Sequence, residues 1–211
     1  MIRWCGDNPS IWFEELEDEK WAKICLFVNG PRYREYTYQF AHELVHLFAN
    51  VEEDSRVAKL GWLDEMFADL GSAYVLRKFY IHSPYPSYSR SDWDEYYNAA
   101  YDGKDQDLVR NYNIQISTDP PDWLPNWIDD LERYRYERAL NWAFARELLP
   151  YFIAMPELWQ QVGMLHRWKT RPDSLQELLR VWEGVLKENG MKTTVVDLMR
   201  ERIPLKIRLR R

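Results

Sequence analysis

The sequence contains few of the residues that bind metals or form covalent cross-links. Among 211 residues there are two cysteines and four histidines. Two cysteines do not form a disulfide framework, and no Cys-x-x-Cys pair is present to hold zinc or to act in redox chemistry. We therefore expect Cys5 and Cys25 to be reduced and the protein to be cytoplasmic, while the sequence leaves a Cys5–Cys25 bridge open as the alternative. The scarcity of histidine also leaves few possible ligand sets for a metal.

Long apolar runs are missing too. No stretch approaches the roughly 20 apolar residues that a membrane-spanning helix needs, and residues 1–7 lack the apolar segment of a signal peptide. We expect no membrane partner. The net charge of −6 makes a nucleic-acid partner unlikely. The basic tail, residues 200–211, is expected to dock on the acidic body or to form an exposed edge strand.

The composition and the periodicity indicate a soluble, mostly helical protein. Hydrophobic residues make up 46% of the chain, and we expect the 11 tryptophans and 14 tyrosines to be mainly structural. One strand is predicted at Trp21–Val28, after an acidic turn at Glu14–Lys20. A helix is predicted at Tyr33–Val51, because its apolar residues recur on one helix face. That face consists of Phe40, Leu44, Leu47 and Val51.

Further helices should follow along the chain. A second helix begins near Gly61 and runs to about Tyr80, with an apolar stripe of Leu63, Met66, Phe67, Leu70 and Tyr74. A short helix from Ser91 or Asp92 to Tyr101 and an irregular stretch at Lys104–Pro121 come next. The last four expected helices span Trp127–Leu149, Pro156–Trp168, a segment capped by Ser174 and Glu177 and ending near Asn189, and Val195–Arg202.

One short motif indicates a chemical function. Residues 42–46 read HELVH, the HExxH pattern of zinc metallopeptidases. Residues four apart lie on the same face of a helix, so the imidazoles of His42 and His46 can converge on one metal ion. Glu43 lies about 100° further round the helix, which suits contact with a water in the open position of the metal better than ligation.

A catalytic zinc needs three protein ligands and one water, so a third ligand is expected downstream. Glu65 follows His46 after eighteen residues and lies at the start of the next predicted helix. Asp69 is four residues further on, so it shares a face with Glu65. A carboxylate there can accept the free N–H of a ligating histidine and orient its ring.

These residues resemble the gluzincin metallopeptidases. The HELVH motif followed after eighteen residues by Glu65 is similar to the pattern of that clan, and WLDEMFA at residues 62–68 looks like the corresponding segment of its aminopeptidases. Glu65 with Asp69 is similar to the Glu-x-x-x-Asp of thermolysin-type members. The resemblance implies one zinc ion with His42, His46 and Glu65 as ligands. It further implies Glu43 as the general base and Asp69 as the partner of His42.

The resemblance also implies a fold and an activity. We expect an α+β, mostly helical, zincin-like protein: a small N-terminal sheet packs on an active-site helix and a glutamate helix. The catalytic subdomain spans residues 1–103, and a helical C-terminal subdomain spans residues 104–211. The expected activity is hydrolysis of peptide or protein substrates. No Gly-x-Met-Glu-Asn segment is present, so an endopeptidase is expected rather than an aminopeptidase.

Several points stay open at the level of sequence. The alternatives are a zinc-containing regulatory or interaction protein with little peptidase activity, and a zinc hydrolase of another amide or ester. The oligomeric state is unknown. The edge of the strand at Trp21–Val28 is a possible site for an extended peptide, or binds nothing. The group that stabilises the oxyanion is unassigned, because no local motif chooses among His166, Tyr112, Tyr134 and Tyr136.

Overall fold

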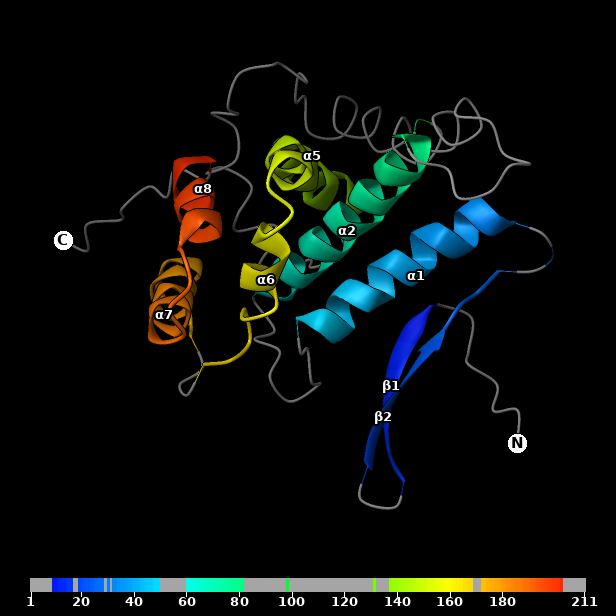
Figure 1. Cartoon of the computed structure of the whole chain (residues 1–211), viewed down its shortest axis with the longest axis horizontal. Helices are drawn as coiled ribbons and strands as arrows, with labels where there is room; N and C mark the ends of the chain where they lie inside the picture. Colours follow the sequence, from blue (N-terminus) through cyan, green and yellow to red (C-terminus); the bar gives the residue numbers. More distant parts are fainter. Residues whose placement is uncertain are drawn as a thin grey trace.

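The computed structural model has an N-terminal β-hairpin beside a set of helices (Figure 1). It describes residues 9–16, 19–28, 30, 32–49, 60–81, 98, 131, 137–168 and 172–202. Within these residues there are two strands and six helices. The prediction of a mostly helical chain with a small N-terminal sheet is therefore confirmed for the described part. The elements keep the labels of Figure 1.

The hairpin consists of β1 (Ser10–Leu16) and β2 (Glu19–Cys25). The strands are antiparallel, and Ser10 pairs with Cys25 at one end while Leu16 pairs with Glu19 at the other. The predicted strand at Trp21–Val28 is thus shifted toward the N-terminus, and β1 was missed. The acidic segment read as a turn belongs largely to the two strands, because backbone pairing across the hairpin outweighs the low strand propensity of glutamate.

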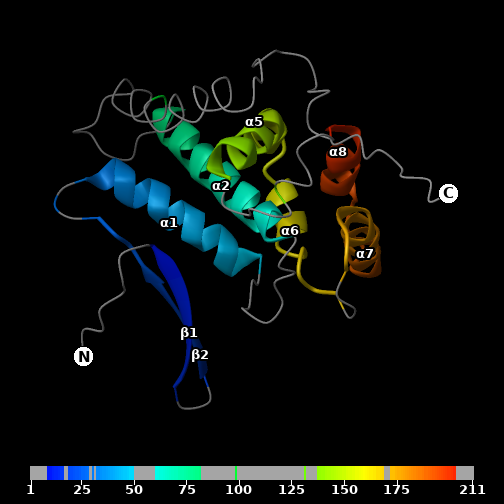
Figure 2. The ribbon, with the colours of Figure 1, turned by 180° about the vertical axis from the view of Figure 1, so that it is seen from behind.

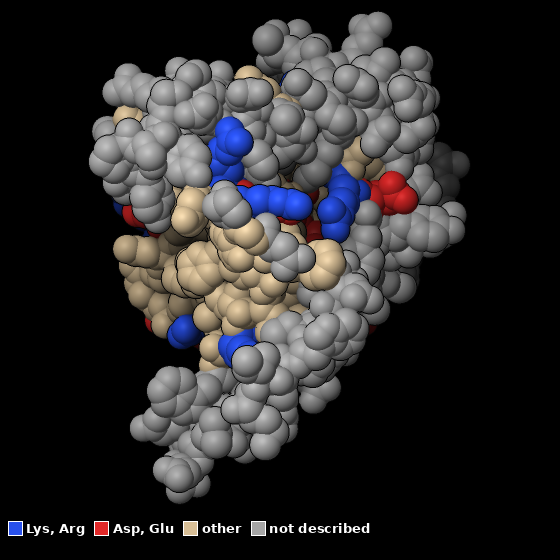
Figure 3. All heavy atoms as spheres, turned by 90° about the vertical axis from the view of Figure 1, so that its right-hand side faces the viewer, with Lys and Arg blue, Asp and Glu red and all other residues tan. Residues whose placement is uncertain are grey.

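Helix α1 (Tyr33–Phe48) begins where predicted and ends three residues earlier. The apolar face noted in the sequence is not the face that is buried. Phe40 is 46% exposed and Leu44 is 42% exposed, whereas Ala41 and Val45 on another face are buried. Periodicity identifies an apolar stripe but not which face meets a neighbour, and α1 packs on the next helix through its Ala41 and Val45 side. Figure 3 shows a side of the molecule where the described surface is mostly uncharged, with Lys and Arg near its edge.

Helix α2 (Gly61–Ile81) is the central element, and its predicted bounds are nearly right. It contacts α1 on one side and α5 on the other, and both views show α1 and α2 side by side (Figures 1 and 2). Leu63, Phe67 and Leu70 are buried as predicted. Gly71 permits the close approach of α1, since a methyl group there would lie 2.3 Å from Cγ2 of Val45.

Helix α5 (Arg138–Ala154) packs on α2 and continues through Pro150. The sequence placed that proline beyond the helix end, because proline in a helix interior removes a hydrogen bond and clashes with the preceding turn. Leu148 and Phe152, on either side of the proline, are buried in the core. Their burial holds the helix continuous.

The C-terminal part adds α6 (Leu158–Val162), α7 (Leu175–Glu188) and α8 (Thr194–Arg202). Helix α6 is much shorter than the predicted Pro156–Trp168 helix, and turns follow it. Helix α7 has the predicted cap, in which Glu177 N–H donates to Oγ of Ser174 (3.2 Å). Helix α8 begins one residue before the predicted start. Arg200 of α8 pairs with Glu183 of α7 at 2.6 Å, so this part of the basic segment docks on the body.

One hydrophobic core joins α1, α2, α5, α6, α7 and α8. Three of its largest members are tryptophans that are at most 1% exposed: Trp62, Trp142 and Trp182. This confirms a structural role for those three rings. The division at residues 103 and 104 stays a prediction. The predicted continuous helix Trp127–Leu149 is wrong, because Glu137 is not helical and α5 begins only at Arg138. Other expectations lie outside the described residues: the helix ending at Tyr101, the stretch Lys104–Pro121, and residues 203–211 of the tail.

Cys25 is disulfide-bonded, so the prediction that it is reduced is wrong; Cys5 lies outside the described residues. Disulfides persist mainly in oxidising compartments. The cytoplasmic location therefore stays a prediction without the support of free thiols. In the part of the chain that the structure describes, no helix combines the length and hydropathy needed to cross a membrane.

Candidate metal centre

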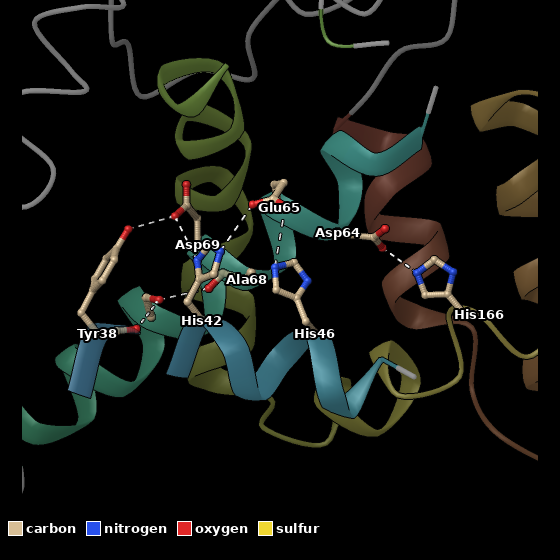
Figure 4. A network of polar contacts seen from close by, with 9 residues as sticks. Tyr38, His42, His46, Asp64, Glu65, Ala68, Asp69 and His166 are labelled. Atoms are coloured by element: carbon tan, nitrogen blue, oxygen red, sulfur yellow. Dashed lines mark hydrogen bonds and ion pairs between the residues drawn. The ribbon is translucent and has the colours of Figure 1, made fainter. Parts of the chain in front are cut away.

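The candidate centre lies where α1 and α2 face each other. The two helices run in opposite directions side by side (Figure 1). Helix α1 contributes His42 and His46, which are one turn apart, and α2 contributes Glu65 from its first turns. All three side chains point into the space between the helices (Figure 4). The predicted convergence of the HELVH helix with the downstream glutamate is thus present in the fold.

The three side chains offer a compact set of donor atoms. Nε2 of His42 lies 3.4 Å from Oε2 of Glu65, and Nε2 of His46 lies 3.8 Å from Oε1 of Glu65. One ligand atom from each residue can be chosen so that all of them lie within 4.8 Å of one another. The side chains are largely enclosed, with exposed fractions of 19%, 9% and 18%.

This arrangement fits a metal ion. Nitrogen and oxygen ligands about 2.0–2.1 Å from a tetrahedral metal are separated by about 3.3 Å, close to the separations between Glu65 and the two imidazoles. The same separations are longer than an ordinary hydrogen bond of about 2.7–3.2 Å. The His42, His46 and Glu65 group could therefore hold a metal ion, and its mixed donors do not by themselves identify the metal.

Asp69 lies behind His42, on the side away from Glu65. Its Oδ1 is 3.6 Å from Nδ1 of His42, and the side chain of Asp69 is only 6% exposed. The expected position beside the first histidine is therefore correct. A carboxylate at Nδ1 favours the tautomer whose proton is on Nδ1, which leaves Nε2 free to bind a metal.

Tyr38 extends this arrangement and was not identified from the sequence. Its hydroxyl donates to Oδ1 of Asp69 at 3.1 Å, and its backbone carbonyl accepts a hydrogen bond from Oγ of Ser72 at 3.0 Å. The ring of Tyr38 stacks on that of His42, with 6.4 Å between ring centroids. A signal was available, because Tyr38 precedes His42 by four residues and so shares its helix face.

The charges of the cluster are strongly coupled. Burial lowers the pKa of His42, but hydrogen bonds and negative charge from Asp69 and Glu65 outweigh burial and raise the pKa to about 9. Burial raises the pKa of Glu65, yet the hydrogen bond from His42 and the charges of His46 and His42 outweigh it, so the pKa is lowered. These neighbouring charges favour the protonated form of His42 and the ionised form of Glu65.

Glu43 is adjacent to His42 and is buried, with 7% of its surface exposed. It is not a member of the group of metal-binding side chains found among the described residues. Its predicted place outside the ligand set stays a prediction. Burial of a carboxylate beside a metal-binding group is the environment in which general bases are commonly found.

His166, a candidate for the oxyanion-stabilising group, is engaged elsewhere. Its Nε2 lies 2.6 Å from Oδ1 of Asp64, and both side chains are buried. In Figure 4 this pair lies to one side of the three candidate ligands. The other candidates, Tyr112, Tyr134 and Tyr136, lie outside the described residues. The oxyanion role therefore stays unassigned.

The chain that leaves β2 is attached to α1 by side chains of that helix. The N–H of Phe27 donates to Oε1 of Gln39 at 2.8 Å, and Nε2 of Gln39 donates to the carbonyl of Phe27 at 3.2 Å. The hydroxyl of Tyr36 donates to the carbonyl of Val28. Both polar backbone groups of Phe27 are thus used within the protein, so an added peptide strand would have to pair with the hairpin itself.

No protein-family model, curated protein or solved structure matches the chain.

Proposed function

We propose that this protein is a zinc-dependent hydrolase that cleaves peptide bonds, with one zinc ion per chain held by His42, His46 and Glu65. The observation that carries the proposal is the convergence of those three side chains between two packed helices. Two imidazoles and one carboxylate are the usual protein ligands of one class of catalytic zinc site. The gluzincin resemblance and the zincin-like order of hairpin, HELVH helix and glutamate helix support the same assignment.

The donor set favours catalysis over a purely structural site. Structural zinc sites have four protein ligands, commonly cysteines, whereas three protein ligands leave one position open. The described residues contribute three such ligands here, none of them cysteine. A buried carboxylate, Glu43, follows the first of them directly.

Each residue then has a role. Zinc, when bound, would polarise the substrate carbonyl and lower the pKa of a coordinated water toward neutrality. Glu43 takes the proton of the attacking water and passes it to the leaving amine. The carboxylate of Asp69, whose Oδ1 lies 3.6 Å from Nδ1 of His42, would hold the ring in its ligating orientation. Tyr38 orients Asp69 through its hydroxyl group.

The substrate is proposed to be an internal segment of a peptide or protein. Endopeptidase activity is favoured because the segment with which aminopeptidases of the clan hold a free amino terminus is missing from the sequence. Both strands of the hairpin contact α1, and an edge of the hairpin would offer an extended peptide backbone pairing.

The test is a matched set of variants. The wild type should bind about one zinc per chain by metal analysis and should cleave casein or members of a peptide library. His46→Ala should lose both the metal and the activity. Glu43→Gln should keep the zinc and lose cleavage, because the amide cannot take up a proton.

The results also separate the alternatives. A wild type without bound zinc would overturn the metal assignment. A protein that binds zinc but cleaves no peptide points to a regulatory or interaction protein, or to a hydrolase of another amide or ester, which a panel of ester and amide substrates would distinguish. Full turnover by Glu43→Gln would exclude Glu43 as the base.

A further inference from the structure

Two buried polar side chains from distant parts of the sequence meet beside the candidate centre. Nε2 of His166 lies 2.6 Å from Oδ1 of Asp64. The two side chains are 4% and 6% exposed and are 102 residues apart in the chain. His166 follows α6, and the ring of Trp168 packs edge-on against it, with 4.7 Å between ring centroids. The contact therefore joins the C-terminal part of the fold to the start of α2.

The position of Asp64 in α2 connects this contact to metal binding. Asp64 directly precedes Glu65, the only candidate ligand that α2 supplies within the described residues. Both lie near the N-terminal end of the helix, where the first backbone N–H groups lack helical partners, so side-chain contacts help to fix this turn. Figure 4 shows Asp64 directed toward His166 while Glu65 faces the two imidazoles. A restraint on Asp64 therefore restrains the turn that carries Glu65.

The chemistry of the pair argues that it does more than stabilise the fold. A buried pair of polar or charged groups commonly contributes less to stability than apolar residues of similar volume, since both groups lose their hydration. Nδ1 of His166 is also buried and has no hydrogen-bond partner among the described residues. Burial of a polar group without a hydrogen-bond partner lowers the stability of the folded protein. What the contact provides is a directional restraint of defined length, which apolar packing at the same place does not provide.

We propose that Asp64 and His166 are a positioning pair that holds Glu65 in place for metal binding. The inference rests on the proposed metal centre and deepens it. Neither residue belongs to the candidate ligand group. Asp64 acts through the backbone of α2, and His166 anchors Asp64 from the segment after α6.

The experiment replaces His166 by two amide side chains of different length, glutamine and asparagine. In His166→Gln the side-chain nitrogen can still reach Asp64, because Nε2 of glutamine takes a place similar to Nε2 of histidine. In His166→Asn the side chain is one methylene shorter and cannot reach it. Gln161→Asn is the matched control: Gln161 is buried, and its Oε1 accepts a hydrogen bond from the N–H of Val195 at 2.9 Å, which holds α8. Asp64→Ser breaks the same contact from the other side.

Three quantities are measured on the full chain. Zinc affinity is determined by competition with a chromophoric chelator, and the ligand geometry is followed by the visible absorption bands of bound Co²⁺. The urea midpoint of the metal-free protein reports stability. His166→Asn should weaken zinc binding by about tenfold or more and alter the Co²⁺ bands, the size expected when a group that orients a ligand is lost. His166→Gln should stay close to the wild type, and Gln161→Asn should lower only the urea midpoint.

Other results would overturn the inference. If His166→Asn lowers the urea midpoint as Gln161→Asn does but keeps the zinc affinity and the Co²⁺ bands, the pair is merely structural. Should His166→Asn fail to fold, Asp64→Ser decides by the same criteria, and a wild-type zinc affinity and spectrum in that variant reject the proposal. If the wild-type protein binds neither zinc nor Co²⁺, both the proposed metal centre and the positioning role are rejected. The measurement on the wild type therefore distinguishes failure of the metal centre from failure of the positioning role alone.

Discussion

The hydroxyl of Tyr38 donates a hydrogen bond to the same Oδ1 atom of Asp69 that faces Nδ1 of His42. Tyr38, Asp69 and His42 therefore form a row of contacts. Tyr38 of α1 holds the carboxylate of Asp69 in α2, and that carboxylate faces the candidate ligand His42. The carboxylate is nearly enclosed, with 6% of its side chain exposed. Its orientation is consequently set by these neighbours rather than by water.

Tyr38→Phe should weaken zinc binding without loss of fold. Phenylalanine keeps the ring beside His42 but removes the hydrogen bond to Asp69, so the carboxylate orients the imidazole less well. The expected loss of zinc affinity is about threefold to tenfold. This is no more than the smallest loss that is typical when a hydrogen-bond partner of a metal ligand is removed, about tenfold. Tyr36→Phe is the control, since its hydroxyl bonds the carbonyl of Val28 instead. Equal zinc affinities of the two variants, measured by chelator competition, would contradict the role of Tyr38.

The stability of the metal-free protein should fall as the pH rises above neutrality. The pKa of His42 is raised from 6.5 to about 9 in the folded protein. The folded state therefore binds this proton more tightly than the unfolded state does. The resulting stabilisation is complete below pH 6.5 and is lost as the pH rises through 9.

The contribution of Glu65 to stability has the opposite dependence on pH. Its pKa is lowered from 4.5, so its contribution is present above pH 4.5 and is lost on acidification below that value. Urea unfolding in the presence of a chelator should thus give a maximum midpoint between pH 4.5 and 6.5. His42→Gln should flatten the alkaline side of this profile, and a wild-type midpoint that stays constant from pH 6.5 to 9 would refute the assignment.

Zinc binding should release protons and become tighter as the pH rises. A ligating imidazole must be neutral, yet His42, with a pKa of about 9, is protonated in the metal-free protein at neutral pH. Calorimetric titrations in buffers of different ionisation enthalpy should show about one proton released from His42 for each zinc bound. Asp69→Asn should reduce this release, because it removes a charge that raises the pKa of His42. A proton count that is the same in both proteins would argue against the coupling.

Gly71→Ala should destabilise the protein although alanine favours helices. Alanine improves intrinsic helix propensity by about 1 kcal/mol, but its methyl group would lie 2.3 Å from Cγ2 of Val45. Relief of that overlap should cost about 1–3 kcal/mol or more and move α1 away from α2, so zinc affinity should fall as well. Gly184→Ala, where nothing lies within 4 Å of the added carbon, should raise the unfolding midpoint. If both variants are stabilised, Gly71 does not set the distance between the helices.

Local features of the sequence were predicted well because they depend on residues close together in the chain. The i and i+4 spacing of His42 and His46 needs only one helix turn, and the Ser174 cap needs only the next three residues. Pairing across β1 and β2 was missed because glutamates at Glu14 and Glu15 have little strand propensity of their own. Proline statistics likewise ended the helix at Pro150, where burial in the core carries it onward.

The sequence alone determined that two imidazoles share one helix turn and that acids follow on the next helix, since these relations follow from the helical repeat. Only the tertiary structure decided which groups meet. The contact at Gly71 turns the histidine face of α1 toward α2 and leaves Phe40 exposed. That packing places Glu65 across from both imidazoles and Asp69 behind one of them, and it brings His166 to Asp64 across 102 residues. Such contacts depend on how whole helices pack, which the periodicity of each helix does not specify.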